Sequence, residues 1–184
     1  IGSIASAGTY AYLAGSSFVM QQFFGLTKQE YGIAFAFVAS AMVIATQLNR
    51  YFLKKHSSEY ISRMANTWQA FIGILMIVAL MTNLLSFPVM LILIFCFLFG
   101  HGFIFPNTSA VALTPFKGLA GSASALLGCI QMAIGALASA LVSFFHNGTA
   151  WPMLSVMCAG GILSLILHLM VKNKFQKELE TSSN

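Results

Sequence analysis

Two long stretches without a charged side chain constrain this sequence more than any other feature. No Asp, Glu, Lys or Arg occurs in residues 64–116 or in residues 118–171. Each stretch is long enough for two membrane-spanning helices of about 20 residues with a turn between them. A charge near the middle of a bilayer costs at least about 2.5–3.5 kcal/mol on insertion scales, so this absence is typical of transmembrane segments.

The composition of the whole chain agrees with this interpretation. Hydrophobic residues make up 58% of the 184 residues and charged residues only 7%, whereas soluble domains carry about 25% charged residues. The net charge of +5 comes from basic residues in loops, so we expect no nucleic-acid partner. The three cysteines lie in apolar runs without metal or disulfide spacing, and we expect no metal site and no cofactor. The sequence therefore predicts an all-α polytopic membrane protein in a lipid bilayer.

Six apolar segments are separated by short polar or basic loops. We predict six transmembrane helices over residues 2–24, 31–52, 65–83, 88–113, 119–145 and 151–171, followed by a polar, frayed tail over residues 172–184. Three spans per unit invert the second unit relative to the first, so we expect two inverted three-helix repeats. Because the chain starts without Met and directly in an apolar run, we also expect it to be cut from a longer protein.

The basic residues predict how this bundle is oriented. Eight of the nine Lys and Arg residues follow the second, fourth and sixth spans, and only Lys28 lies in another loop. The positive-inside rule places the basic side in the cytoplasm, so both chain ends should be cytoplasmic. Trp68 and Trp151 should open the third and sixth spans at the membrane interface, where aromatic residues are enriched.

Polar and small residues mark faces on two of the spans. The first span carries a polar face that suits either a cavity for a weakly polar solute or contact between helices: Ser3, Ser6, Tyr10, Ser17 and Gln21. The fifth span carries a face of mostly small residues that predicts close helix contact: Gly121, Ala125, Gly128, Met132, Gly135 and Ser139. Gln131 lies beside this face, where its amide bonds either a neighbouring helix or a substrate.

The fourth span contains the only titratable side chain deep in a predicted span. His101 lies between Gly100 and Gly102, and Pro106 and Asn107 follow. The glycines and the proline predict a kink that lines a cavity. His101 is either a proton relay or a neutral side chain hydrogen-bonded across helices. The third and sixth spans are nearly apolar, so we expect them outside and the other four spans inside.

Several motifs resemble one branch of the major facilitator superfamily. The run Gly121-Ser-Ala-Ser-Ala-Leu-Leu-Gly128, followed by Gln131, and the run Ile104-Phe-Pro-Asn107 are similar to the Bcr/CflA drug-resistance transporters. Residues 18–25 and 47–49 agree, and the resemblance covers essentially the whole chain. It implies a twelve-helix fold in two six-helix halves, of which this chain is the C-terminal half.

The resemblance also implies a function. Such a protein is a secondary active transporter in the bacterial inner membrane, exporting small, largely apolar drugs by proton antiport and alternating access. Its partners are lipid, the drug, protons and an N-terminal six-helix half. With no acidic residue embedded here, we expect proton coupling in the other half and a substrate surface in this one. The cavity candidates are aromatic and amide side chains: Tyr10, Tyr12, Phe18, Gln21, Phe35, Asn107 and Gln131.

Two other classes of protein are compatible with six spans. A membrane channel subunit or scaffold is one alternative, although no pore motif or ring of charges is seen. An intramembrane serine protease is the other, and it would pair a serine with a histidine. The nearest sequence is Ser122-Ala-Ser124-Ala, which lacks the expected glycines. We therefore expect no enzymatic activity.

Overall fold

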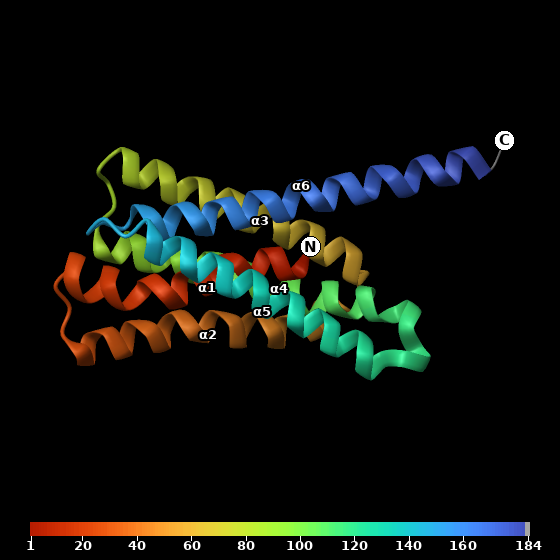
Figure 1. The fold of residues 1–184 in the computed structure, drawn as a ribbon, viewed down its shortest axis with the longest axis horizontal. Coiled ribbons are helices and arrows are strands. Elements are labelled where there is room, and N and C mark those ends of the chain that lie inside the picture. Colours follow the sequence, from red (N-terminus) through yellow and green to blue (C-terminus); the bar gives the residue numbers. More distant parts are fainter. Residues whose placement is uncertain (183–184) are drawn as a thin grey trace.

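The computed structural model of the protein is a bundle of six long helices (Figure 1). The structure describes residues 1–182, and for Lys117 and residues 172–182 it describes the backbone alone. The helices are α1 (Gly2–Phe18), α2 (Lys28–Phe52), α3 (Ser58–Met81), α4 (Phe87–Leu113), α5 (Ala120–Phe144) and α6 (Trp151–Ser182). A π-helical turn, Val19–Phe23, extends α1, and a 3-10 segment, Thr114–Leu119, joins α4 to α5. The predicted all-α class is confirmed.

Five of these helices, α2 to α6, are long and apolar enough to cross a membrane. The α-helical part of α1 has 17 residues, and the π turn adds five more. Within the π turn, the amide of Phe24 bonds the carbonyl of Val19 at 3.1 Å, a spacing of five residues. The structure therefore has the form of a polytopic helical membrane protein.

Local sequence signals explain where the helices begin and turn. Thr27 caps α2 in a capping box with Glu30, and Ser57 caps α3 through the amide of Tyr60. The turn after α1 contains Gly25 with φ 74°, and the turn before α6 contains Gly148 with φ 81°. Glycine adopts this left-handed conformation without the steric cost of a Cβ. These short turns make successive helices antiparallel, as Figure 1 shows.

The most extensive helix contacts follow a two-fold pattern. α1 packs against α4, α5 and α6, whereas α4 packs against α1, α2 and α3, and α3 also packs against α6. Exchanging α1 with α4, α2 with α5 and α3 with α6 leaves this set of contacts unchanged. Because successive helices alternate in direction (Figure 1), the second three-helix unit is inverted relative to the first. The central helices are α1 and α4.

The buried interior differs between the two ends of the bundle. Toward the α1–α2 and α5–α6 turns, the core is apolar and includes five fully buried methionines: Met20, Met76, Met90, Met153 and Met157. Toward the other end, where α2 and α4 finish and α3 begins, the apolar cluster is small and most of the buried polar residues are found. We call these the methionine end and the polar end.

Several local predictions differ from the structure. α3 begins at its cap Ser57, so Trp68 lies well inside the helix and not at its start. α6 continues to Ser182, where a frayed tail was predicted, because the Lys, Gln and Glu residues there favour helix. On α5, a Cβ at Gly121 or Gly128 would meet no atom within 4 Å. The face of small residues that was predicted on the fifth span therefore makes close contacts only in its C-terminal half. In this chain α2 and α5 are the least buried long helices, although they were expected inside.

Candidate functional site

Three consecutive residues of α4 point at three different helices. A Cβ on Gly100 would lie 2.9 Å from Cδ1 of Trp68 on α3, and a Cβ on Gly102 would lie 2.6 Å from Cβ of Ala45 on α2. His101, between them, faces α1. Consecutive residues of a helix point about 100° apart, so the two glycines allow two close neighbours while the histidine meets a third. The glycines thus serve helix contact.

The sequence predicted a kink near these glycines, but the helix is not interrupted there. α4 continues as one helix through Pro106 to Leu113. The non-helical backbone comes later, at Phe116, with φ −104° and ψ 33°. Trp68 on α3 also holds α3 against α4, because its indole nitrogen donates to the carbonyl of Cys96 on α4 at 2.9 Å.

Side chains from three helices meet at Ser6, and we call Ser6, His101 and Gln131 the polar junction. The Ser6 hydroxyl donates to the carbonyl of Gly2 at 3.0 Å and accepts from Nε2 of Gln131 at 3.3 Å. Nε2 of His101 lies 3.5 Å from the same oxygen. With the hydroxyl proton directed at the Gly2 carbonyl, His101 bonds this oxygen as a donor, in the tautomer of the neutral ring that carries its proton on Nε2. Nδ1 is left as a buried acceptor with no partner in the described part.

A pair of amide side chains links α2 to α4. Nδ2 of Asn107 donates to Oδ1 of Asn49 at 2.7 Å and to the carbonyl of Phe103 at 2.7 Å. Both amide protons of Asn107 are thereby used, and its buried Oδ1 has no partner among the described residues. In the two-fold pattern, the α2–α4 contact corresponds to the α5–α1 contact, which Gln131 and Ser6 link. An amide hydrogen bond therefore ties α2 to α4, and another ties α5 to α1.

The predicted aromatic residues lie on α1 and its neighbours. The hydroxyl of Tyr10 donates to Sδ of Met132 at 3.6 Å, and its ring lies where a Cβ of Gly135 would be. Tyr12 is 2% exposed and stacks on Phe35 with ring centroids 5.9 Å apart. Tyr10 is thus partly accessible beside α5, whereas Tyr12 is part of the core.

The last two predicted residues lie at the methionine end. The ring of Phe18 meets that of His146 edge to face, with centroids 4.0 Å apart. Nε2 of Gln21 donates to the Ser17 hydroxyl at 2.8 Å. The structure therefore brings Tyr10, Gln131 and His101 to one region around α1, but it does not gather all the predicted residues in one cavity.

Sequence reasoning missed a polar cluster between α3 and α6. The Ser164 hydroxyl lies 2.5 Å from Oδ1 of Asn66 and 3.3 Å from the carbonyl of Ile1. The amide of Gln69 is completely buried with no partner for either atom in the described part, and His168 is also buried on α6. The third and sixth spans were predicted to be nearly apolar, and these buried polar residues show that this prediction is wrong. The spacing of Asn66 from Gln69 could have shown one polar face.

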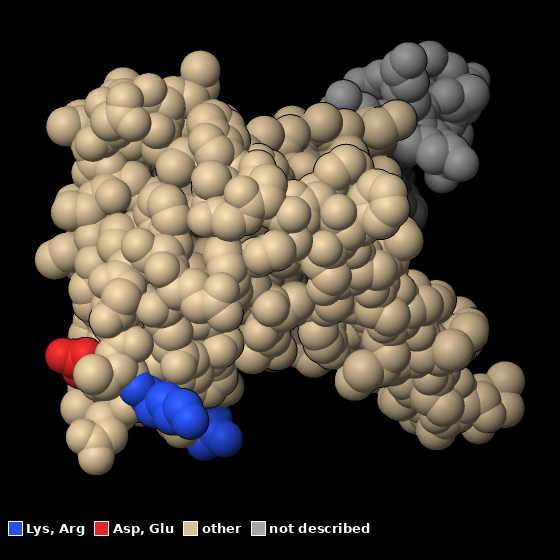
Figure 2. All heavy atoms as spheres, turned by 60° about the vertical axis from the view of Figure 1, so that its left-hand side comes forward, with Lys and Arg blue, Asp and Glu red and all other residues tan. Residues whose placement is uncertain are grey.

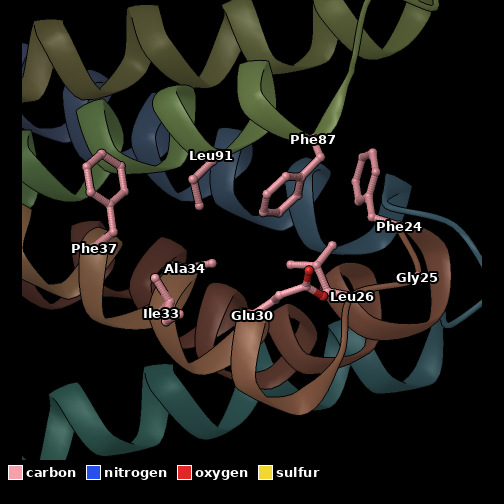
Figure 3. Close-up of a pocket in the computed structure, with 9 residues that line it drawn as sticks. All are labelled: Phe24, Gly25, Leu26, Glu30, Ile33, Ala34, Phe37, Phe87 and Leu91. Carbon is pink, nitrogen blue, oxygen red and sulfur yellow. The ribbon is translucent and has the colours of Figure 1, made fainter.

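One pocket opens at the methionine end, beside the α1–α2 turn (Figure 3). It has a volume of about 490 Å³. Its walls are mostly apolar, and one residue is charged: Phe24, Gly25, Leu26, Glu30, Ile33, Ala34, Phe37, Phe87 and Leu91. None of the predicted cavity residues lines this pocket.

Charged side chains are scarce on the surface as well. The face in Figure 2 shows only a few blue and red groups in one lower region, and the rest of the described surface there is tan. Within the described residues, no group of three His, Cys, Asp or Glu side chains could hold a metal ion. The fold, the long apolar helices and the scarcity of charged side chains define a polytopic helical membrane protein in a lipid environment.

Comparisons with known proteins find similarity to two bacterial proteins, one of them named as a transporter. The chain is 27% identical over 172 residues to the Bicyclomycin resistance protein homolog of Haemophilus influenzae. The match covers 94% of this chain and 43% of the relative. It is 26% identical over 157 residues to YdgK, an uncharacterized MFS-type transporter of Bacillus subtilis, covering 85% of this chain and 38% of that protein. The chain thus spans less than half the length of these relatives. No family model and no solved structure matches.

These relatives confirm the resemblance to a Bcr/CflA-type transporter of the major facilitator superfamily. One relative is named for resistance to bicyclomycin and the other as an MFS-type transporter, and neither is named as an enzyme. The intramembrane protease alternative has no support from either relative.

Proposed function

We propose that this chain is the C-terminal half of a drug exporter of the bacterial inner membrane, with both of its ends in the cytoplasm. The observation that carries the proposal is the match to 94% of this chain but only 43% of a protein named for bicyclomycin resistance. A six-helix unit of this length is half of a twelve-helix transporter. The exposed faces of α2 and α5 are then available to the N-terminal half.

The substrate surface in this half is centred on Tyr10 and Gln131. Both side chains are partly exposed and lie on facing sides of the α1–α5 contact. A phenol and an amide suit apolar drugs that carry a few hydrogen-bonding groups. The remaining candidates act behind this surface or after a conformational change: Tyr12, Phe18, Gln21, Phe35 and Asn107.

Alternating access and proton antiport complete the proposal. The acidic side chains of the described spans, Glu30 and Glu59, lie in the first turns of α2 and α3 and not near mid-span, so proton coupling is assigned to the other half. His101 is assigned a neutral role, because its Nε2 already faces the Ser6 hydroxyl at 3.5 Å and a charge at this depth is expensive.

The test uses the whole protein in cells and in proteoliposomes. Gln131→Leu should lower the affinity for bicyclomycin about three- to tenfold, because one hydrogen bond in a membrane protein contributes about 0.6–1.5 kcal/mol. Gln22→Leu, a matched change at an exposed position, should leave the affinity unchanged. Equal effects of the two variants, or no drug-dependent efflux by the wild type, would refute the proposal.

A separate variant tests the role of His101. His101→Gln should keep drug-driven proton movement, measured with a pH-sensitive dye inside the vesicles. Complete loss of proton movement with unchanged drug binding would instead identify His101 as a proton relay.

A further inference from the structure

The pocket at the methionine end has the composition of a binding site separate from the polar junction. It lies between the start of α2 and the start of α4, and Figure 3 shows rings of Phe24, Phe37 and Phe87 around it. Its volume of about 490 Å³ falls in the range of about 300–1,000 Å³ that is usual for small-molecule sites. Its walls thus suit an apolar body with aromatic groups.

The only charged residue of the pocket is Glu30, whose carboxylate points into it in Figure 3. The amide and the hydroxyl of Thr27 both donate to Oε2 of Glu30, each at 2.8 Å. No donor among the described residues reaches Oε1. This carboxylate therefore has a fixed position and a free acceptor oxygen.

We propose that this pocket binds an amphiphilic cation, with the charged head at Glu30 and the apolar body among the phenylalanines. A carboxylate accepts hydrogen bonds from, or attracts, an onium group. The faces of aromatic rings also attract cations within about 6 Å. Both interactions favour a cation over a neutral molecule of the same shape. This site does not depend on the proposed transport function, since it shares no residue with the polar junction.

The test compares two ligands of similar shape on the whole protein in nanodiscs of uncharged phosphatidylcholine. Methyltriphenylphosphonium carries a positive charge, and triphenylphosphine oxide carries the same three rings without one. Glu30→Gln removes the charge but keeps the capping box, because Gln also serves at this position of a helix. We expect this variant to bind the cation about fivefold more weakly, as for a partly solvated ion pair, and to bind the neutral ligand unchanged.

Two further variants make the test specific. Glu59→Gln makes the same chemical change in the first turn of α3, outside the pocket, and should affect neither ligand. Phe87→Ala removes a wall of the pocket and should weaken both ligands. Equal cation affinities in wild type and Glu30→Gln, or an equal loss in Glu59→Gln, would overturn the proposal. Unchanged binding of both ligands in Phe87→Ala would also overturn it.

The outcome is distinguishable from a failure of the proposed function. Gln131→Leu should leave the affinity for methyltriphenylphosphonium unchanged, because Gln131 lies on α5 and lines no part of this pocket. A protein that fails to export bicyclomycin could still show the effect of Glu30→Gln, and the reverse also holds.

Discussion

The contact of α4 with α2 at Gly102 can be tested by adding a single methyl group. In Gly102→Ala the new Cβ would lie 2.6 Å from Cβ of Ala45, 3.1 Å from the carbonyl oxygen of Met42 and 3.3 Å from its Cα. None of these atoms is the end of a flexible side chain, so the two helices must move apart. Overfilling a close contact costs about 1–3 kcal/mol.

The same substitution elsewhere provides the reference. A Cβ at Gly128 would meet nothing within 4 Å, so Gly128→Ala should gain only helix propensity, up to about 1 kcal/mol. Both variants share this gain, and their difference isolates the steric cost. We expect Gly102→Ala to be less stable than Gly128→Ala by about 1–3 kcal/mol, measured by SDS titration of the whole protein in mixed micelles.

A second change identifies the atom responsible. Ala45→Gly removes the contact at 2.6 Å but leaves the Met42 backbone in place. Combined with Gly102→Ala, it should restore part of the lost stability and give a positive coupling in a double-mutant cycle. If Gly102→Ala and Gly128→Ala changed the free energy of unfolding equally, the close α2–α4 contact would be refuted.

Three further predictions concern single hydrogen bonds and use the same unfolding titration. Trp68→Phe keeps an aromatic ring, although a smaller one, but loses the bond to the Cys96 carbonyl and should cost at least about 0.6–1.5 kcal/mol, whereas an unchanged value would exclude that bond. Asn49→Ala leaves Asn107 one acceptor short and should cost about 1–2 kcal/mol; no loss would show that water replaces it. Thr27→Ala removes the cap of α2 and should cost about 1 kcal/mol, with a neutral result refuting the cap.

The long elements could be predicted from the sequence because hydrophobicity and charge determine them. The gaps between charged residues predicted four helices, the two apolar segments before them predicted two more, and three helices per unit predicted the inverted arrangement. The boundaries were harder. Ser57 caps α3, which begins at Ser58, seven residues before the predicted span, because a cap sets the start of a helix while hydropathy reports only its apolar part.

The candidate site was predictable only in part, because hydrogen bonds between helices depend on their rotation and depth. Gln131 was placed correctly as facing the bundle, and it donates to Ser6. The pairing of Asn66 with Ser164 joins residues about a hundred positions apart, and a polar face on one helix does not indicate which residue of another helix it meets. The pocket at Glu30 was missed because a single carboxylate in a short loop between two spans gives no indication of a ligand.

The contrast between the two ends of the bundle has a consequence for sequence variation. Unbranched thioether chains adapt to altered surroundings, so substitutions among Met20, Met76 and their neighbours should accumulate one at a time. An amide needs a complementary group at a defined angle, so Asn49 and Asn107 can change safely only as a pair. In an alignment of related chains, covarying positions should therefore concentrate near the basic loops and be scarce on the opposite side.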